Sequence, residues 1–236
     1  MKQFNAQVIE VIPRTHNVTS FRLVAEEILD FQAGQFMQVT LAVNGCEQSK
    51  YFSFSSSPTE KKYFEFTKKM TGSEFSKALE RLKSGDMLTV KMPMGKFVLD
   101  GTASKHAFLS GGIGITPIRS ILKDASDRGL PLDAVLFYSN HSPEDVVFRS
   151  ELEAMAAEKK FRLVLSLDTK DVCPADWKGR CGFIDAKMIR EELPDYQERL
   201  FYVCGPPVMV QSMVSILEGQ LKVPGERIRK ENFAGY

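Results

Sequence analysis

The chain has 236 residues, of which 43% are hydrophobic and 26% are charged, and its 31 Lys and Arg residues nearly balance its 30 Asp and Glu residues. This composition is that of a globular protein and excludes collagen, a coiled coil and a disordered tail protein. The near-neutral charge argues against nucleic acid as the main partner, because nucleic-acid-binding domains usually carry a basic excess.

The spacing of the cysteines and the length of the apolar stretches indicate whether the protein binds metal and in which cellular compartment it lies. None of the four cysteines belongs to a C-x-x-C pair, so neither a zinc site nor an iron–sulfur cluster is expected. The N-terminus lacks an apolar signal core, and the most apolar stretch, residues 200–210, is too short to span a bilayer. We therefore expect a cytoplasmic protein with free thiols, no metal and no membrane span.

The first part of the chain, residues 4–99, consists of short runs rich in Val, Phe, Thr and Leu, separated by Gly, Pro, Asn and Asp. This rhythm is typical of antiparallel strands and predicts a β-barrel or sandwich. One amphipathic helix is predicted after Ser73, with Phe75 and Leu79 on one face and Gly85 as its stop.

From residue 105 onward, apolar strand-like runs alternate with amphipathic helices. Strands without in-out alternation, each followed by a helix, indicate parallel βαβ units in a sheet covered on both faces. We therefore predict two domains, an antiparallel β-barrel over residues 1–99 and an α/β domain with a parallel sheet over residues 100–236.

A glycine-rich segment, residues 109–117, lies between the first strand and the first helix of the predicted α/β domain. Glycines at such a turn let backbone N–H groups approach an anion, and the helix N-terminus adds a favourable dipole. The segment predicts a diphosphate-binding loop, although a turn that binds nothing fits the same pattern. The candidate residues are Gly111, Gly112, Gly114, Thr116 and Pro117, with Pro117 at the place of the third glycine of a G-x-G-x-x-G fingerprint.

A second segment, residues 50–58, combines one cation, three aromatics and four hydroxyls. Alternation along a strand predicts the two Phe rings on one face, with the Tyr and the first two Ser residues on the other. One face can then pack while the other meets a planar polar ligand. An edge strand followed by a Ser-rich turn is the alternative. The candidates are Lys50, Tyr51, Phe52, Ser53, Phe54, Ser55 and Ser56.

Three further segments carry weaker signals. The start of the predicted helix contains small and hydroxyl residues that serve either as N-caps or as phosphate donors. A late strand ends in Cys-Gly-Pro at the ligand-binding edge of a parallel sheet, although such a cysteine is more often a buried hydrophobe. Two aromatics at the C-terminus either cover a flat ligand or fray. These candidates are Lys68, Gly72, Ser73 and Ser76, then Cys204, Gly205 and Pro206, and finally Phe233 and Tyr236.

Taken in order, these segments resemble the ferredoxin-NADP reductase superfamily, whose motifs are R-x-Y-S, G-x-G-x-x-P and C-G-P. Here they correspond to residues 50–53, 112–117 and 204–206. The resemblance implies a flavin-binding antiparallel barrel followed by a nicotinamide-nucleotide domain. It also implies a reductase that passes a hydride from NAD(P)H to flavin N5 and then electrons to a separate acceptor, such as ferredoxin, flavodoxin or an oxygenase-type carrier.

The resemblance assigns roles in the predicted barrel. Lys50 stands where the family has a phosphate-pairing Arg, so the charge is kept and the bidentate fork is lost. Phe52 stands where the family has the Tyr whose ring lies against the isoalloxazine. Ser53 would hydrogen-bond flavin N5, and Ser55 and Ser56 would lie toward the ribityl and phosphate side.

The remaining implied roles concern the diphosphate and the nicotinamide. Residues 72–76 would contribute to the diphosphate site, which makes FAD rather than FMN the expected cofactor. Thr116 and Cys204 would flank the place where nicotinamide meets flavin. Phe233 or Tyr236 would cover the other face of the ring.

The choice of NADH or NADPH depends on the group that meets the 2′-position of the adenosine ribose. NADPH-using relatives often have a Ser-Arg pair after the strand that appears here before Ser166, whereas this chain continues to Asp168. A carboxylate accepts hydrogen bonds from a free ribose diol and repels a 2′-phosphate. NADH is therefore expected, although Lys170 or Arg180 folding over the site would admit NADPH.

Two other functions fit the same motifs. Free-flavin reductases of the superfamily have Phe in the flavin motif, so flavin is either a bound cofactor or a diffusing substrate. A non-catalytic subunit that keeps the fold as a nucleotide sensor or docking platform is the third possibility, motivated by the two altered flavin contacts.

Overall fold

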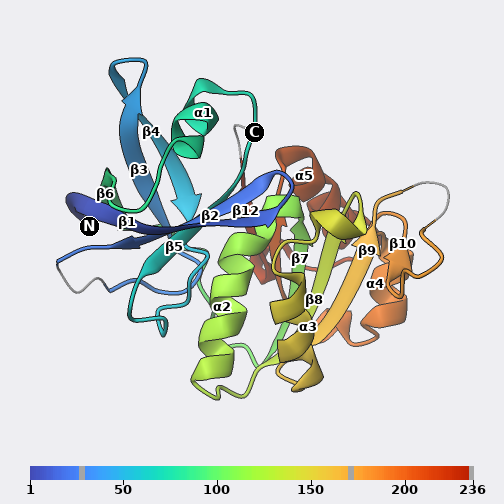
Figure 1. Cartoon of the computed structure of the whole chain (residues 1–236). Helices are drawn as coiled ribbons and strands as arrows, with labels where there is room; N and C mark the ends of the chain where they lie inside the picture. Colours follow the sequence, from blue (N-terminus) through green and yellow to red (C-terminus); the bar gives the residue numbers. More distant parts are fainter. Residues whose placement is uncertain (27–29, 170–172, 234–236) are drawn as a thin grey trace. The chain divides into compact units, whose positions relative to one another are not determined.

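The computed structural model describes residues 1–26, 30–169 and 173–233, which form two compact units (Figure 1). Unit 1 consists of residues 1–99 and 119–128, and unit 2 of residues 100–118 and 129–236. Helix α2 (Ile115–Asp127) contributes its first four residues to unit 2 and the others to unit 1. Neither unit is a single stretch of sequence, so the linear division into domains 1–99 and 100–236 stays a prediction.

Unit 1 is built on a six-stranded sheet with the order β4-β3-β6-β1-β2-β5, in which every neighbouring pair is antiparallel. A bridge between Phe54 and Phe66 joins the chain just after β4 to β5, so the two edges of the sheet approach each other and the sheet curls into a partly closed barrel. The predicted antiparallel barrel is confirmed. Its strands are β1 (Lys2–Thr15), β2 (Val18–Val24), β3 (Phe36–Val43), β4 (Cys46–Ser53), β5 (Phe64–Lys69) and β6 (Met87–Met94).

The predicted helix is α1 (Glu74–Glu80), and it packs Phe75 and Leu79 against the core of the barrel. It ends before the predicted stop at Gly85. That glycine instead has a φ of 101° and its N–H donates to the carbonyl of Val8, in the turn that leads into β6. Only glycine takes this left-handed conformation without strain, so the residue marks a turn and not the end of the helix.

Unit 2 contains a six-stranded sheet with the order β10-β9-β8-β7-β11-β12, in which every neighbouring pair is parallel. The predicted α/β architecture is confirmed. The strands are β7 (Lys105–Gly111), β8 (Asp133–Asn140), β9 (Arg162–Leu167), β10 (Arg180–Cys181), β11 (Leu200–Gly205) and β12 (Ile228–Asn232).

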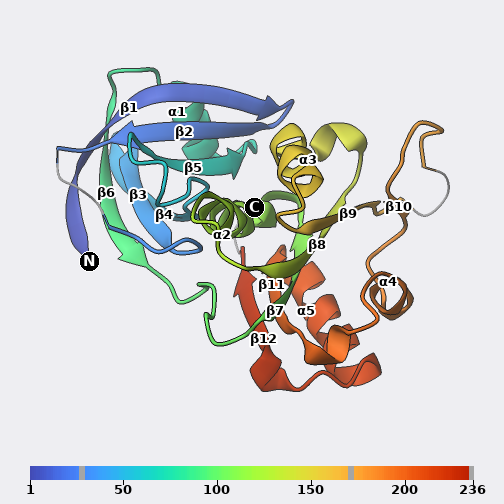
Figure 2. The same cartoon turned by 90° about the horizontal axis from the view of Figure 1, so that it is seen from below.

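Helices lie on both faces of this sheet, with α3 on one face and α4 and α5 on the other (Figure 2). The apolar side chains of α4 and α5 form one continuous core with inward residues of β7, β8 and β11. These helices are α3 (Arg149–Ala157), α4 (Ala186–Glu192) and α5 (Pro207–Ser215); the short helical turns of the chain are η1 (Gly112–Gly114), η2 (Pro143–Asp145), η3 (Tyr196–Glu198), η4 (Ile216–Gln220) and η5 (Gly225–Arg227).

The strand order reverses between β7 and β11. From β7 the chain adds β8, β9 and β10 on one side, and it then returns to place β11 and β12 on the other side. The carboxyl ends of β7 and β11 are therefore neighbours at the point of reversal, which is where open parallel sheets bind ligands. None of the helices in the described residues is long and apolar enough to cross a membrane.

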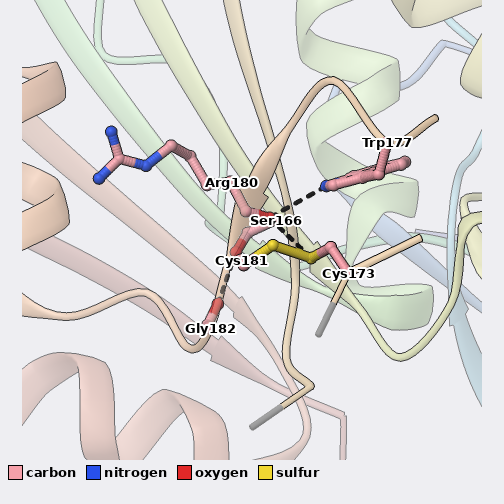
Figure 3. Close-up of a disulfide and its surroundings, with 6 residues drawn as sticks. All are labelled: Ser166, Cys173, Trp177, Arg180, Cys181 and Gly182. Atoms are coloured by element: carbon pink, nitrogen blue, oxygen red, sulfur yellow. Dashed lines mark hydrogen bonds between the residues drawn. A yellow bond between two sulfur atoms is a disulfide. The ribbon is translucent and has the colours of Figure 1, made fainter. Parts of the chain in front are cut away.

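The expectation of four free thiols is wrong. Cys173 and Cys181 form a disulfide with an S–S distance of 2.03 Å, whereas Cys46 is free and exposed and Cys204 is free and buried (Figure 3). The eight-residue spacing matches no short motif. The chain after β9 loops around before β10 pairs parallel with β9, and in this loop the Cα atoms of Cys173 and Cys181 lie 6.0 Å apart, within the range for a disulfide.

Candidate functional site

The end of β4 supplies a hydroxyl that the fold leaves unused. Ser53 is 4% exposed, and its Oγ is buried and has no hydrogen-bond partner among the described residues. A buried hydroxyl without a partner is unfavourable, so such a group in a native protein calls for an explanation. A flavin with its N5 at Ser53 would supply the missing partner, and this hydroxyl therefore fits the role implied by the family motif.

The two following serines differ, because their hydroxyls are used inside unit 1. Ser55 Oγ donates to Glu65 Oε1 at 2.8 Å and accepts from Thr67 Oγ1 at 2.7 Å. Ser56 Oγ accepts from the Glu65 backbone N–H at 2.9 Å. Both hydroxyls therefore hold the segment in place, and a direct contact of Ser55 or Ser56 with the cofactor stays a prediction.

Glu65 organises this segment, and sequence reasoning missed it. Its carboxylate is 1% exposed and forms ion pairs with Arg14 at 2.9 Å and Arg22 at 3.0 Å, in addition to the hydrogen bond from Ser55. A buried carboxylate is stable only when it is paired and hydrogen-bonded. The sequence gives no warning of this burial, because alternation in Phe64-Glu65-Phe66 places the acid on the face opposite the two Phe rings, where a charge is ordinarily exposed.

The aromatic residues of the segment alternate as expected. Phe52 and Phe54 are buried and stack on Phe66 and Phe31, with ring centroids 4.8 and 3.9 Å apart, whereas Tyr51 is 62% exposed. Ser53 is buried as well, because the bridge after β4 draws the chain into the closing edge of the barrel at this point. A contact of the Ser53 side of the strand with a planar ligand stays a prediction. The structure gives Phe52 a packing role in the core.

Two lysines gather positive charge near this segment. Lys68 is 5% exposed and its Nζ donates to the Lys69 carbonyl at 3.1 Å. Burial, and then repulsion by the Lys50 ammonium group, lowers the pKa of Lys68 to about 8. Two ammonium groups that repel each other form a favourable environment for an anion, and a diphosphate would remove the repulsion between them.

The residues at the start of α1 cap the helix. Ser73 Oγ accepts the Ser76 N–H at 3.3 Å, and Ser76 Oγ contacts the hydroxyls of Ser73 and Thr71, both at 3.0 Å. This is the N-cap arrangement expected for hydroxyl residues at a helix start. The phosphate-binding role of Gly72, Ser73 and Ser76 stays a prediction.

In unit 2, the glycine-rich turn after β7 packs directly against the turn after β11. A Cβ atom added at Gly114 would lie 2.3 Å from the Cys204 carbonyl oxygen, so only glycine fits there. Gly112 has a φ of 51°, which also favours glycine. Tyr138, on β8, supports the turn from below, because its hydroxyl donates to the Gly112 carbonyl at 3.0 Å. The fold thus brings together two motifs that lie about ninety residues apart in the sequence.

Three side chains at this edge, those of Cys204, Thr116 and Ser110, are uncharged. Burial raises the pKa of the Cys204 thiol well above its ordinary value, so the thiol stays protonated and carries no charge. Thr116 Oγ1 donates to the Ile113 carbonyl at 3.2 Å. Ser110, the residue before the glycines, has a buried Oγ that lacks a partner in the described part of the chain. An uncharged wall with one unused hydroxyl suits a flat polar ring such as nicotinamide.

The remaining residues of this edge come from the ends of α2, α5 and β12. Pro117 lies in the first turn of α2, and Pro206 precedes α5. The Gly205 carbonyl accepts the Phe233 N–H at 3.0 Å, which ties the chain after β12 to the end of β11. Tyr236 lies outside the described residues.

A second corner of the sheet is formed after β8 and β9. The Asp168 N–H donates to the Asn140 carbonyl at 2.9 Å, and Asp168 Oδ1 pairs with His141 Nδ1 at 2.6 Å. Ser166 Oγ donates to the Gly182 carbonyl at 2.6 Å, so this predicted ligand residue holds β10 in place (Figure 3). Sequence reasoning identified Asp168 and missed its partnership with His141, which adjacent strands create.

The basic residues that would admit NADPH are not directed to this corner in the described part of the chain. Arg180 forms ion pairs with Glu191 at 2.5 Å and with Glu192 at 2.9 Å. Figure 3 shows its guanidinium group pointing away from Trp177 and Ser166. Lys170 lies outside the described residues. The corner therefore contains the Asp168 carboxylate with its exposed His141 partner, and its contact with a ribose stays a prediction.

Comparison with known proteins identifies both units by family. The model of the oxidoreductase FAD-binding domain matches residues 5–99, and that of the oxidoreductase NAD-binding domain matches residues 108–215. Together the two matches cover most of the chain.

Curated relatives are reductases. The glycine betaine monooxygenase reductase subunit of Pseudomonas aeruginosa is 33% identical over 217 residues, which are 89% of this chain and 59% of the relative. NADH-cytochrome b5 reductase 1 of Laccaria bicolor is 31% identical over 234 residues, which are 94% of this chain and 74% of the relative. The chain thus spans about three fifths of the length of the first of these relatives and three quarters of the second.

Solved structures share the fold over the whole chain. The cytochrome b5 reductase domain of Ulva prolifera nitrate reductase superposes with a TM-score of 0.85 at 24% identity, covering 98% of this chain and 97% of that domain. The ferredoxin reductase in carbazole 1,9a-dioxygenase gives a TM-score of 0.82 at 27% identity, covering 98% of this chain and 69% of that protein. With its FAD-binding and NAD-binding domains in this order, the chain belongs to the ferredoxin-NADP reductase superfamily of oxidoreductases.

Proposed function

We propose that this protein is an FAD-dependent NADH reductase that delivers electrons to a separate acceptor. The observation that carries the proposal is the presence of an FAD-binding and an NAD-binding oxidoreductase domain in one chain. When bound, the flavin accepts a hydride at N5 and can pass the electrons on one at a time, so it connects a two-electron donor with a one-electron acceptor. The protein's own residues bind and orient the two nucleotides.

Three groups hold the flavin in this proposal. The Ser53 hydroxyl hydrogen-bonds N5, because it is buried and otherwise unpartnered. Lys50 and Lys68 attract the diphosphate, which offsets the burial and the Lys50 repulsion that together lower the pKa of Lys68. Glu65 acts indirectly, because it fixes the backbone on which Ser55 and Ser56 follow Ser53.

The nucleotide edge of unit 2 holds NADH. Gly112 and Gly114 allow the diphosphate close to the backbone, and Thr116 and the protonated Cys204 line the nicotinamide position. Because Asp168 presents a carboxylate at the ribose corner, NADH is preferred over NADPH. Acid–base side chains are not needed for the hydride step, since the work of the protein is positioning.

The acceptor is proposed to be a one-electron carrier. The named relatives include a reductase subunit of a monooxygenase and reductases of cytochrome b5, which makes an oxygenase component, a ferredoxin-type carrier or a small haem protein the classes to test. A cytoplasmic location stays a prediction from composition.

The absorbance spectrum of the purified protein tests the proposal. We expect a yellow protein with bound FAD whose long-wavelength flavin band bleaches on anaerobic addition of NADH, and more slowly with NADPH. A colourless protein that reduces only added flavin would instead identify a free-flavin reductase, a reading favoured by Lys50 in place of the bidentate Arg. Flavin that binds but is not bleached by either donor would leave only a nucleotide-sensing or docking role.

A further inference from the structure

The Cys173–Cys181 disulfide closes a short loop that contains the only tryptophan of the chain. Trp177 Nε1 donates to the Arg180 carbonyl at 3.0 Å, and the Arg149 guanidinium lies 5.3 Å from the centre of the indole ring. Figure 3 shows the disulfide and Trp177 on the same stretch of backbone, next to Ser166. These contacts order the loop, and the fluorescence of the Trp177 indole can therefore report a change in its conformation.

This loop is joined to the end of β9 through β10. Arg180 and Cys181 pair with Ser166 and Leu167, the Gly182 N–H donates to the Leu167 carbonyl at 2.8 Å, and Ser166 Oγ donates to the Gly182 carbonyl. Asp168 is the next residue after this pairing. A two-residue strand has few hydrogen bonds of its own, and the disulfide restricts the conformations of the loop that leads into it.

The disulfide is also accessible. Cys181 is exposed and Cys173 is partly exposed, whereas structural disulfides are usually enclosed in a core. Exposed disulfides exchange with external thiols more readily than enclosed ones. External thiols can therefore reduce this disulfide. Because the disulfide lies beside the corner at Asp168, its reduction can alter the conformation of that corner.

We propose that Cys173 and Cys181 form a redox modification site that controls the affinity of the adjacent ribose corner for NADH. This inference rests on the proposed function, because it assigns the corner at Asp168 to the adenosine ribose. The oxidised form holds β10 against β9 and keeps Asp168 in position to receive the ribose diol. The reduced form releases the loop and weakens the binding of the adenosine half of the nucleotide.

The reaction is a thiol–disulfide exchange with a dithiol. A thiolate of the dithiol attacks the more exposed Cys181 sulfur, the protein S–S bond breaks, and Cys173 leaves as a thiolate that takes up a proton. The second thiol of the reductant then displaces Cys181, which leaves as the second protein thiol. The protein disulfide gains two electrons and two protons, and the dithiol becomes a disulfide.

Direct binding of ADP-ribose and NADH to the oxidised and reduced full-length protein tests the proposal. Dithiothreitol is the reductant, and mass spectrometry confirms the gain of two hydrogen atoms at the pair. We expect the dissociation constants to rise about threefold to tenfold on reduction. The reason is that only a fraction of the reduced molecules would have the corner in its binding conformation. The KM for NADH should rise by the same factor while kcat stays constant, and Trp177 emission should change with reduction.

Matched variants separate the pair from other thiols. The C173S/C181S double variant should bind ADP-ribose like the reduced wild type and should not respond to dithiothreitol. The single variant C181S should behave in the same way, and C46S, which changes the exposed thiol of unit 1, should respond like the wild type. The CD spectrum of each variant controls for folding.

Equal affinity of the oxidised and reduced wild type for ADP-ribose, with the mass change confirmed, would overturn the inference and leave the proposed function intact. Recovery of both cysteines as free thiols after mild oxidation would overturn it as well. A chain that binds ADP-ribose in neither state would instead contradict the nucleotide site itself, and with it the proposed function.

Discussion

Neighbouring serines in the 50–58 segment have opposite roles in the hydrogen-bond network. Ser53 has a buried hydroxyl without a partner, whereas the Ser55 hydroxyl is bonded to Glu65 and Thr67. A hydroxyl that the fold does not use is available to a ligand, and one that the fold uses is needed for stability. We therefore expect Ser53 to serve ligand binding and Ser55 to serve stability, although the two residues are neighbours at the end of one strand.

This difference predicts contrasting effects of two Ser-to-Ala substitutions. S53A should slow flavin reduction by NADH by about 100-fold, the scale of losing one positioned hydrogen bond, without lowering the stability of the apoprotein. S55A should cost about 1–3 kcal/mol of unfolding free energy, because Glu65 and Thr67 lose a partner. Stopped-flow absorbance and urea unfolding measure the two effects. A large loss of apoprotein stability in S53A would contradict the assignment.

Asp168 predicts the choice of nucleotide. D168N keeps the shape of the side chain and its acceptor for His141 but removes the negative charge. The ratio of kcat/KM for NADPH to that for NADH should rise by about tenfold, which corresponds to about 1.4 kcal/mol. Steady-state kinetics with both donors measure the ratio. The same charge change at the exposed Glu80 of unit 1, in E80Q, should leave it constant.

At the scale of the elements, the site depends on a backbone contact between two turns. The turn from β7 into α2 touches the turn from β11 into α5 so closely that Gly114 has no room for a methyl group. This contact follows from the reversal of strand order at β7 and β11. It explains why the glycine-rich loop and the Cys-Gly-Pro motif act together.

G114A tests this contact. The new methyl group would meet the Cys204 backbone at 2.3 Å, so the two turns must separate. We expect a loss of about 1–3 kcal/mol of stability and a raised KM for NADH, with FAD still bound. G219A is the matched control, because Gly219 has open space around its Cα and an ordinary φ. Equal behaviour of the two variants would mean that the contact is unimportant.

At the scale of the whole molecule, each unit contains a buried titratable group that responds to acid. In unit 1, burial opposes ionisation of Glu60, but the hydrogen bond and charge of Arg119 outweigh it and lower the pKa of Glu60 to about 2. In unit 2, burial of His106 next to Phe108 and Tyr202 lowers the pKa of the imidazole below its ordinary value of 6.5.

Both shifts predict that acid destabilises the protein, in two separate ranges. Below pH 6.5 the unfolded chain binds a proton at His106 more readily than the folded chain, so stability falls until the folded-state pKa is passed. The contribution of Glu60 is complete above pH 4.5 and is lost as the pH falls toward 2. Thermal unfolding followed from pH 8 to pH 3 measures both ranges.

Two variants assign the ranges to their residues. H106F should remove the loss of stability that begins below pH 6.5, because Phe packs with Phe108 and Tyr202 and binds no proton. E60Q should lower stability at neutral pH and flatten the range below pH 4.5. An unchanged pH profile in either variant would show that another group titrates there.

Local sequence patterns were enough to predict the two classes of structure and the family motifs. Short β-rich runs before residue 99 and alternating strands and helices after residue 105 predicted the antiparallel barrel and the parallel sheet, because backbone periodicity is a local property. The glycine-rich loop was located by its place between a strand and a helix. These features depend on neighbours within a few residues, which the linear chain displays.

Contacts between distant segments determine which polar groups the fold uses and which it leaves for a ligand. Three contacts join segments that folding brings together: the Asp168–His141 pair, the hydrogen bond from Ser55 to Glu65 and the Cys173–Cys181 disulfide. Such contacts arise from strand order and packing between distant segments, and no local pattern encodes them.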